Sequence, residues 1–196
     1  MPSDDKIRTW PRTPEERRQL WRIGQAYIAG SYAVQVFLGI LVAYDVIRLH
    51  PSNVEEESLK GFTARVEYAL HYQTLLALWL LFNTSITIYR RLTRNALNPL
   101  DETTEDRVEL DKRVLTNSLE QIVLSVFLQL IFVSYATPGC ILRFIPLVNI
   151  VQLIGRILFY VGYPLYRAFG FNCSLFPNTL MGLYNLYKFG AFMQLY

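Results

Sequence analysis

The sequence is poor in cysteine and in charge. Only two of its 196 residues are cysteine, which excludes a disulfide-stabilised scaffold and leaves too few thiols for a zinc site. Charged residues make up 18 % of the chain, below the proportion of about 25 % found in ordinary soluble domains. The net charge of +3 is too small to indicate nucleic acid as a partner.

Charge is missing altogether from three long stretches. Residues 23–44, 68–89 and 121–142 each run for 22 residues without Asp, Glu, Lys or Arg. A helix that crosses a bilayer needs about 20 such residues. Hydrophobic residues account for 52 % of the sequence. The pattern predicts an all-α integral membrane protein and leaves no room for a soluble α/β enzyme.

Two further apolar stretches raise the expected number of membrane crossings to five. Residues 141–166 carry no charge except Arg143 and Arg156, and residues 168–187 carry none. We expect Pro177 in the first turn of the last helix, where its missing N–H costs little. The predicted crossings are 24–47, 66–90, 114–136, 142–167 and 176–195.

Basic residues predict how the bundle is oriented. Fourteen of the 19 Lys and Arg residues fall on the side of the N-terminus and of the second connection. Because short cytosolic segments carry the excess of basic residues, the N-terminus is expected to be cytosolic and the C-terminus lumenal. The chain then divides into a cytosolic segment at 1–22, an extra crossing with a lumenal loop at 23–65, and a four-helix membrane domain at 66–196.

Three clusters of polar residues fall on the predicted cytosolic half. A charge at bilayer depth is costly and usually marks a site. Arg113, Asn117 and Glu120 are spaced i, i+4 and i+7, which places them on one helix face. The other clusters are Arg156, Tyr160, Tyr163 and Arg167 on the fourth predicted helix, and Arg90, Arg91 and Arg94 at the end of the second.

Together these clusters predict a pocket for a small ligand with more than one carboxylate and a single amine. Guanidinium groups bind carboxylates bidentately, and Glu120 would take the ammonium group. A structural interpretation stays open beside this one. The arginines at the helix ends could anchor them at the headgroups, and Glu120 could form an ion pair with Arg156 between two helices.

The same residues resemble motifs of the MAPEG superfamily, the membrane-associated proteins of eicosanoid and glutathione metabolism. The spacing Arg113-x-x-x-Asn117-x-x-Glu120 is similar to its Arg-x-x-x-Asn-x-x-Glu signature. The segment from Arg156 to Tyr163 resembles its Arg-x-x-Tyr-x-x-Gly-Tyr segment. The resemblance covers about residues 66–195, with four helices in the expected order. Because the first crossing is additional, the chain most resembles a five-helix, mattrin-like branch.

The resemblance implies a homotrimer that binds glutathione between neighbouring subunits and meets lipophilic substrates among the membrane lipids. Arg167 and Arg91 would be the catalytic candidates, because a thiol has a pKa of about 8.5 and needs a nearby cation to react as a thiolate. Carried over by position, the glutathione contacts would be Arg90, Arg113, Asn117, Glu120, Arg156 and Tyr163.

Two departures from the family pattern bear on catalysis. Phe159 stands where the family's transferases tend to have Tyr, and Gly170 and Phe171 stand where they have a thiolate-stabilising Arg. These departures favour a non-catalytic or weakly catalytic glutathione-pocket protein that acts through other membrane proteins in the secretory or endolysosomal pathway. Its membrane would be that of the endoplasmic reticulum, the Golgi or an endolysosome. The alternative is a glutathione-dependent membrane transferase or peroxidase that acts on lipophilic electrophiles.

Overall fold

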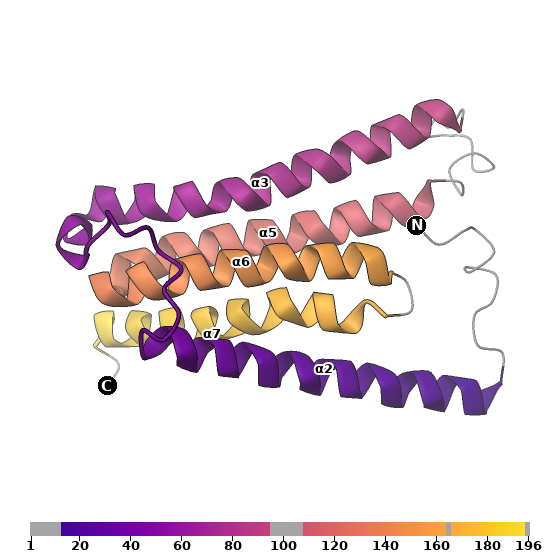
Figure 1. Cartoon of the computed structure of the whole chain (residues 1–196), viewed down its shortest axis with the longest axis horizontal. Helices are drawn as coiled ribbons and strands as arrows, with labels where there is room; N and C mark the ends of the chain where they lie inside the picture. Colours follow the sequence, from indigo (N-terminus) through magenta and orange to yellow (C-terminus); the bar gives the residue numbers. More distant parts are fainter. Residues whose placement is uncertain (1–12, 95–107, 164–165, 195–196) are drawn as a thin grey trace.

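The fold is a bundle of long helices. A computed structural model describes residues 13–94, 108–163 and 166–194, and these residues contain no strand, which confirms the all-α class. Figure 1 shows the arrangement of the helices. They are α2 (Pro14–Ala43), the short 3-10 helix η1 (Glu56–Leu59), α3 (Phe62–Thr93), α5 (Glu109–Tyr135), α6 (Pro138–Gly162) and α7 (Ala168–Phe192).

Several of these helices have the length and the apolar surface of membrane-spanning helices. Within the described residues, α2, α5 and α6 are long and apolar enough to cross a bilayer. Large apolar side chains also lie exposed along the helices, among them Phe37 on α2, Leu81 on α3 and Phe127 on α5. An exposed apolar surface of this extent is expected to face lipid or another protein. The chain is an integral membrane protein, whereas the full set of five crossings stays a prediction.

Helix α2 begins ten residues before the predicted first crossing. The Thr13 hydroxyl accepts a hydrogen bond from the Glu16 amide, and the Glu16 carboxylate accepts one from the Thr13 amide. This reciprocal capping box, followed by Pro14 at the first helical position, is a strong start signal. The segment predicted as a cytosolic tail at 1–22 therefore already contains the first turns of the helix.

The boundary between the last two helices also differs from the prediction. Helix α6 ends at Gly162, and Tyr163 is extended with φ −69° and ψ 140°. Tyr163 precedes a proline in the sequence, and a residue in that position disfavours helical geometry. Helix α7 starts at Ala168, so the placement of Pro177 in the first turn is wrong and Pro177 lies inside the helix.

The helices α3 and α2 lie at opposite edges of the bundle, with α5, α6 and α7 between them (Figure 1). Helix α3 packs on α5 and α6, and α2 packs on α7 and α6. The helices α6 and α7 cross closely because both have glycine at the crossing. A Cβ atom added to Gly170 would collide with backbone atoms of Gly155 and Phe159, and small residues of this kind allow helices to approach in membranes.

An ion pair joins two helix ends at the end of the bundle away from the candidate site. Arg143 donates from Nε to Asp45 Oδ1 at 3.1 Å and from Nη2 to Asp45 Oδ2 at 2.8 Å. Asp45 follows α2 in a left-handed conformation, with φ 55°. The pair neutralises the charge of Arg143 near the start of the predicted fourth crossing. It lies where the chain turns after Ala43.

Candidate functional site

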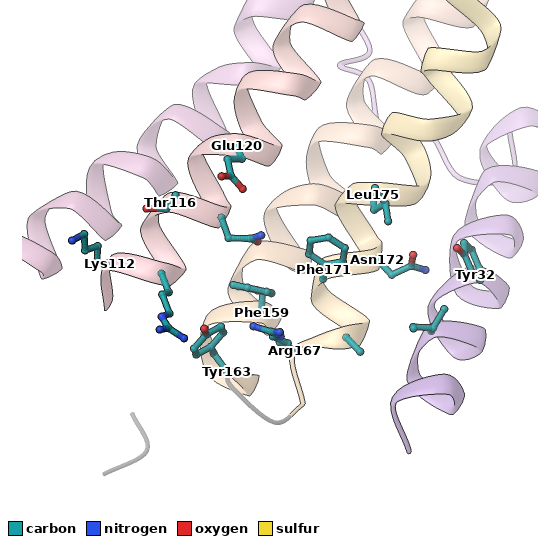
Figure 2. A pocket seen from close by; sticks show the side chains of 14 residues that line it. Tyr32, Lys112, Thr116, Glu120, Phe159, Tyr163, Arg167, Phe171, Asn172 and Leu175 are labelled. Atoms are coloured by element: carbon teal, nitrogen blue, oxygen red, sulfur yellow. The ribbon is translucent and has the colours of Figure 1, made fainter. Parts of the chain in front are cut away.

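A cavity of about 710 Å³ lies at the end of the bundle where α5 and α7 begin and α6 ends. Small-molecule sites have volumes of roughly 300–1,000 Å³. Figure 2 shows the side chains that line it. They are Ile28 and Tyr32 of α2, Lys112, Arg113, Thr116, Asn117 and Glu120 of α5, Phe159 and Tyr163 of α6 and its end, and Arg167, Ala168, Phe171, Asn172 and Leu175 at the start of α7.

The polar face of α5 lines the cavity along its length. Arg113, Asn117 and Glu120, which the sequence places on one face, all contribute to the lining. Lys112 and Thr116 join them, and sequence reasoning missed both. Their signal was present, because Lys112, Thr116 and Glu120 stand four residues apart. At a rise of 1.5 Å per residue, Glu120 lies about 10 Å further along the helix than Arg113.

The Glu120 carboxylate has no hydrogen bond or ion pair with any described residue, and its side chain is exposed. The hypothesis of a structural ion pair between Glu120 and Arg156 is wrong, because Arg156 binds other groups. Glu120 lies at the end of the cavity away from Arg167 and Tyr163 (Figure 2). A carboxylate on a bilayer helix is expensive without a partner.

Arg156 lies behind the cavity wall and is 0 % exposed. Its Nη1 donates to Asn117 Oδ1 at 2.9 Å and its Nη2 to the Gly170 carbonyl at 3.2 Å, which ties α6 to α5 and α7. The guanidinium carbon lies 4.9 Å from the centre of the Phe159 ring. No described carboxylate pairs with this cation, and a guanidinium stays charged in proteins. Arg156 therefore orients Asn117 and adds positive potential beneath the cavity.

The mouth of the cavity is cationic as well. Arg167, the N-cap residue of α7, is exposed, and its guanidinium carbon lies 5.2 Å from the centre of the Tyr163 ring. Arg113 forms an ion pair with Glu109, one turn earlier on α5, and donates from Nε to its Oε1 at 2.7 Å. The N-terminus of α7 adds the partial positive charge of a helix start. The arrangement favours an anionic group at the mouth.

Two arginines at the end of α3 do not join the described lining of the cavity. Arg90 forms an ion pair from Nη1 to Oδ1 of Asp111, a buried residue near the start of α5. Arg91 is half-buried on the same last turn of α3. In one copy of the chain, Arg90 connects two helix ends, whereas the resemblance implies that it contacts a ligand.

The additional helix α2 supplies a wall that sequence patterns did not predict. Ile28 and Tyr32 line the cavity opposite the polar face of α5. Helix α2 is held there by Asn172, whose Nδ2 donates to the buried Ser31 Oγ. Periodicity shows which residues share a face of one helix, but it does not show which faces of two helices meet.

The family model that matches the chain is that of the MAPEG family, over residues 69–187. The chain belongs to the MAPEG family. The matched region begins within α3, ends within α7 and covers more than half of the sequence, so α2 and its wall lie outside it. No curated protein and no solved structure matched the chain in the corresponding comparisons.

Proposed function

We propose that this MAPEG protein binds glutathione in the cavity between α2, α5, α6 and α7, within one chain rather than between neighbouring subunits as the resemblance implies, and does little or no chemistry on it. One observation carries the proposal: a lone carboxylate, Glu120, faces a cavity whose other charged lining residues are cations, Lys112, Arg113 and Arg167. Arg113 already pairs with Glu109, so the charged groups without a counter-charge among the described residues are Arg167 at one end of the cavity and Glu120 at the other. A ligand with the opposite arrangement supplies both counter-charges.

Glutathione fits these requirements. It has two carboxylates and one ammonium group. Its glycine carboxylate would bind near Arg113 and Arg167, where guanidinium groups and the start of α7 favour anions. Its ammonium, at the other end of the tripeptide and on the same carbon as the second carboxylate, would reach Glu120, about 10 Å further along α5. Asn117, held by Arg156, offers its side-chain amide to the peptide groups between the two ends.

The surroundings of the thiol argue for weak catalysis. Phe159 lines the cavity without the hydroxyl group that the family's transferases tend to have at this position. Gly170, where the resemblance places an activating arginine, has no room for a side chain, since even a Cβ atom would collide with backbone. Arg167 faces the cavity but stacks on Tyr163. A thiol that lacks a dedicated cation stays mostly protonated at neutral pH.

The proposal extends to the assembly and its place in the cell. The exposed apolar faces of α3 and α5 suit contacts between copies in a homotrimer. The excess of basic residues supports a cytosolic N-terminus and a lumenal C-terminus, and the apolar stretches of the sequence support five crossings of the mattrin-like kind. We place the protein in a secretory or endolysosomal membrane, where it would act through other membrane proteins. Native mass spectrometry and protease protection of terminal tags test the trimer and the orientation.

Calorimetric titration of the full chain in lipid nanodiscs with reduced glutathione tests the binding. Glu120→Gln should weaken binding about tenfold, whereas Glu67→Gln, which removes an exposed carboxylate of α3 away from the cavity, should not change it. With 1-chloro-2,4-dinitrobenzene as electrophile we expect binding without turnover. Turnover that disappears in Arg167→Ala would instead support the transferase alternative, and a chain that does not bind glutathione would overturn the proposal.

A further inference from the structure

The end of the cavity at Glu120 has to accommodate two ligand charges together. The ammonium group of glutathione and its second carboxylate are bonded to the same carbon atom, so both arrive at Glu120. Glu120 attracts the ammonium and repels the carboxylate. A carboxylate taken out of water needs hydrogen-bond donors in its place. The side chains within one helical turn of Glu120 therefore decide how this end of the ligand is held.

Two lining side chains of α5 lie one turn before Glu120. They are Asn117 at i−3 and Thr116 at i−4. Side chains at these spacings have Cβ atoms about 5–6 Å apart, and Glu120 leans over this turn because helical side chains tilt toward the N-terminus of their helix. Figure 2 shows Thr116 and Glu120 on neighbouring turns. Asn117 is held by Arg156 and serves the peptide groups of the ligand in the proposed complex.

The Thr116 hydroxyl is not used by its own helix. Ser and Thr hydroxyls within helices commonly donate to a carbonyl one turn earlier. In α3 and α7 the hydroxyls that do so are those of Thr74, Ser85, Thr87, Thr93 and Thr179. Thr116 has no hydrogen bond with a side chain or carbonyl of the described residues, its side chain is exposed, and it lines the cavity. Its hydroxyl is therefore available to a ligand.

A cation continues the row of side chains beyond Thr116. Lys112, Thr116 and Glu120 are spaced i, i+4 and i+8 and all line the cavity. Lys112 lies about 6 Å from Thr116 along the helix axis, so its charge draws an anion toward Thr116 and away from Glu120. The row presents a cation, a neutral donor and an anion in that order. A free α-amino acid end, with its carboxylate beside its ammonium, is complementary to this order.

We infer that Thr116 binds the α-carboxylate of a γ-glutamyl group whose ammonium binds Glu120, with Lys112 attracting the carboxylate from further away. The inference rests on the proposed glutathione site and names its ligand class, peptides with a free γ-glutamyl end. In a γ-linked peptide the α-carboxylate stays free, whereas in an α-linked peptide it is part of the peptide bond. Thr116 occupies an unspecified position of the Arg-x-x-x-Asn-x-x-Glu signature, so the signature alone does not assign this contact.

The test compares glutathione with 4-aminobutanoyl-cysteinylglycine, which lacks only the α-carboxylate. Each is titrated calorimetrically into the full chain in lipid nanodiscs. Glutathione should bind about tenfold more tightly, the effect of one hydrogen bond to a charged group. Thr116→Val removes the hydroxyl, so it should weaken glutathione binding by about the same factor and leave binding of the analogue unchanged. Thr116→Ser keeps the hydroxyl and should keep the preference.

The matched control is Thr74→Val. It removes a hydroxyl from an exposed threonine of α3 that donates to the Leu70 carbonyl and lies outside the cavity lining, and it should not change the preference. A second ligand tests the class. The α-linked isomer of glutathione has the same formula and the same charged groups, and it should bind the unaltered chain about tenfold more weakly than glutathione.

The outcomes separate this inference from the proposed function. Equal affinity of the unaltered chain for glutathione and for the analogue without the α-carboxylate would overturn the inference and leave glutathione binding in place. A chain that does not bind glutathione would overturn both. If Thr116→Val weakened both ligands equally, or Thr116→Ser lost the preference as Thr116→Val does, the Thr116 hydroxyl would not be the group that binds the carboxylate.

Discussion

Two polar regions of the bundle differ in whether the protein itself supplies partners for their polar side chains. In the middle of the bundle, Gln73, Ser125, Gln129 and Asn149 form what we call the amide seam, and all four are buried. Gln129 Oε1 accepts from Gln73 Nε2 at 3.3 Å and from Asn149 Nδ2 at 2.8 Å, while its Nε2 donates to Ser125 Oγ at 2.8 Å. The seam joins α3, α5 and α6 with hydrogen bonds that the side chains supply to one another.

The cavity near the start of α5 is different, because its charged side chains are not paired with one another. Glu120 has no partner among the described residues, and Arg156 has only neutral ones. In a membrane bundle, polar groups that satisfy each other hold helices together, whereas charges left without a counter-charge point to a ligand. The comparison separates structural polar residues from binding residues, and variants in the two regions should differ in which property they change.

The largest effect is expected in the amide seam. Gln129→Leu leaves Gln73, Asn149 and Ser125 without their shared partner, so it should lower the free energy of unfolding by about 3 kcal/mol. Glutathione affinity should not change. Unfolding by sodium dodecyl sulfate in mixed micelles measures the loss. Gln25→Leu, on the exposed surface of α2, is the control and should change stability by less than about 0.5 kcal/mol. A loss no larger than the control would show that the seam is not structural.

The next effect separates the two regions most clearly. Arg156→Met removes the positive potential under the cavity and releases Asn117, so glutathione binding should weaken at least tenfold, or about 1.4 kcal/mol. Stability should fall less than in Gln129→Leu, because removing an uncompensated buried charge offsets the lost hydrogen bonds. Titration and detergent unfolding of the same sample measure both. A large loss of stability with unchanged glutathione affinity would show that Arg156 is a structural residue and not a binding residue.

The smallest effect concerns Arg90, which the resemblance assigns to glutathione and the structure pairs with Asp111. Arg90→Gln should lower the free energy of unfolding, because it removes this guanidinium from the buried Asp111 carboxylate, and should leave glutathione affinity within twofold. Arg48→Gln, an exposed arginine at the other end of the bundle, is the control for loss of charge. Affinity that drops in Arg90→Gln but not in Arg48→Gln would show that Arg90 reaches the ligand.

Sequence reasoning succeeded where one helix decides the outcome. The charge-free runs predicted the long helices, and the spacing of Arg113, Asn117 and Glu120 predicted a shared face that lines one cavity. Both follow from the geometry of a single helix. The start of α2 was also within reach, because Thr13, Pro14 and Glu16 form a recognisable capping signal.

Sequence reasoning failed where two helices must meet. The Arg90–Asp111 pair, the burial of Arg156 behind Asn117 and the α2 wall all depend on packing between helices. The spacing on one helix cannot distinguish an arginine that binds a ligand from one that binds a neighbouring carboxylate. Pro177 shows the same limit, because its place inside α7 follows from where α6 ends and the chain turns back.

The central claim is that Glu120 serves the ammonium group of a bound ligand. The most direct measurement titrates glutathione and its des-amino analogue, which lacks only that ammonium, into the unaltered chain and into Glu120→Gln. If Glu120 contacts the ammonium, glutathione should lose about tenfold in affinity on either change alone, with little further loss when both are combined. Independent losses that multiply, or a des-amino analogue that binds as well as glutathione, would contradict the account.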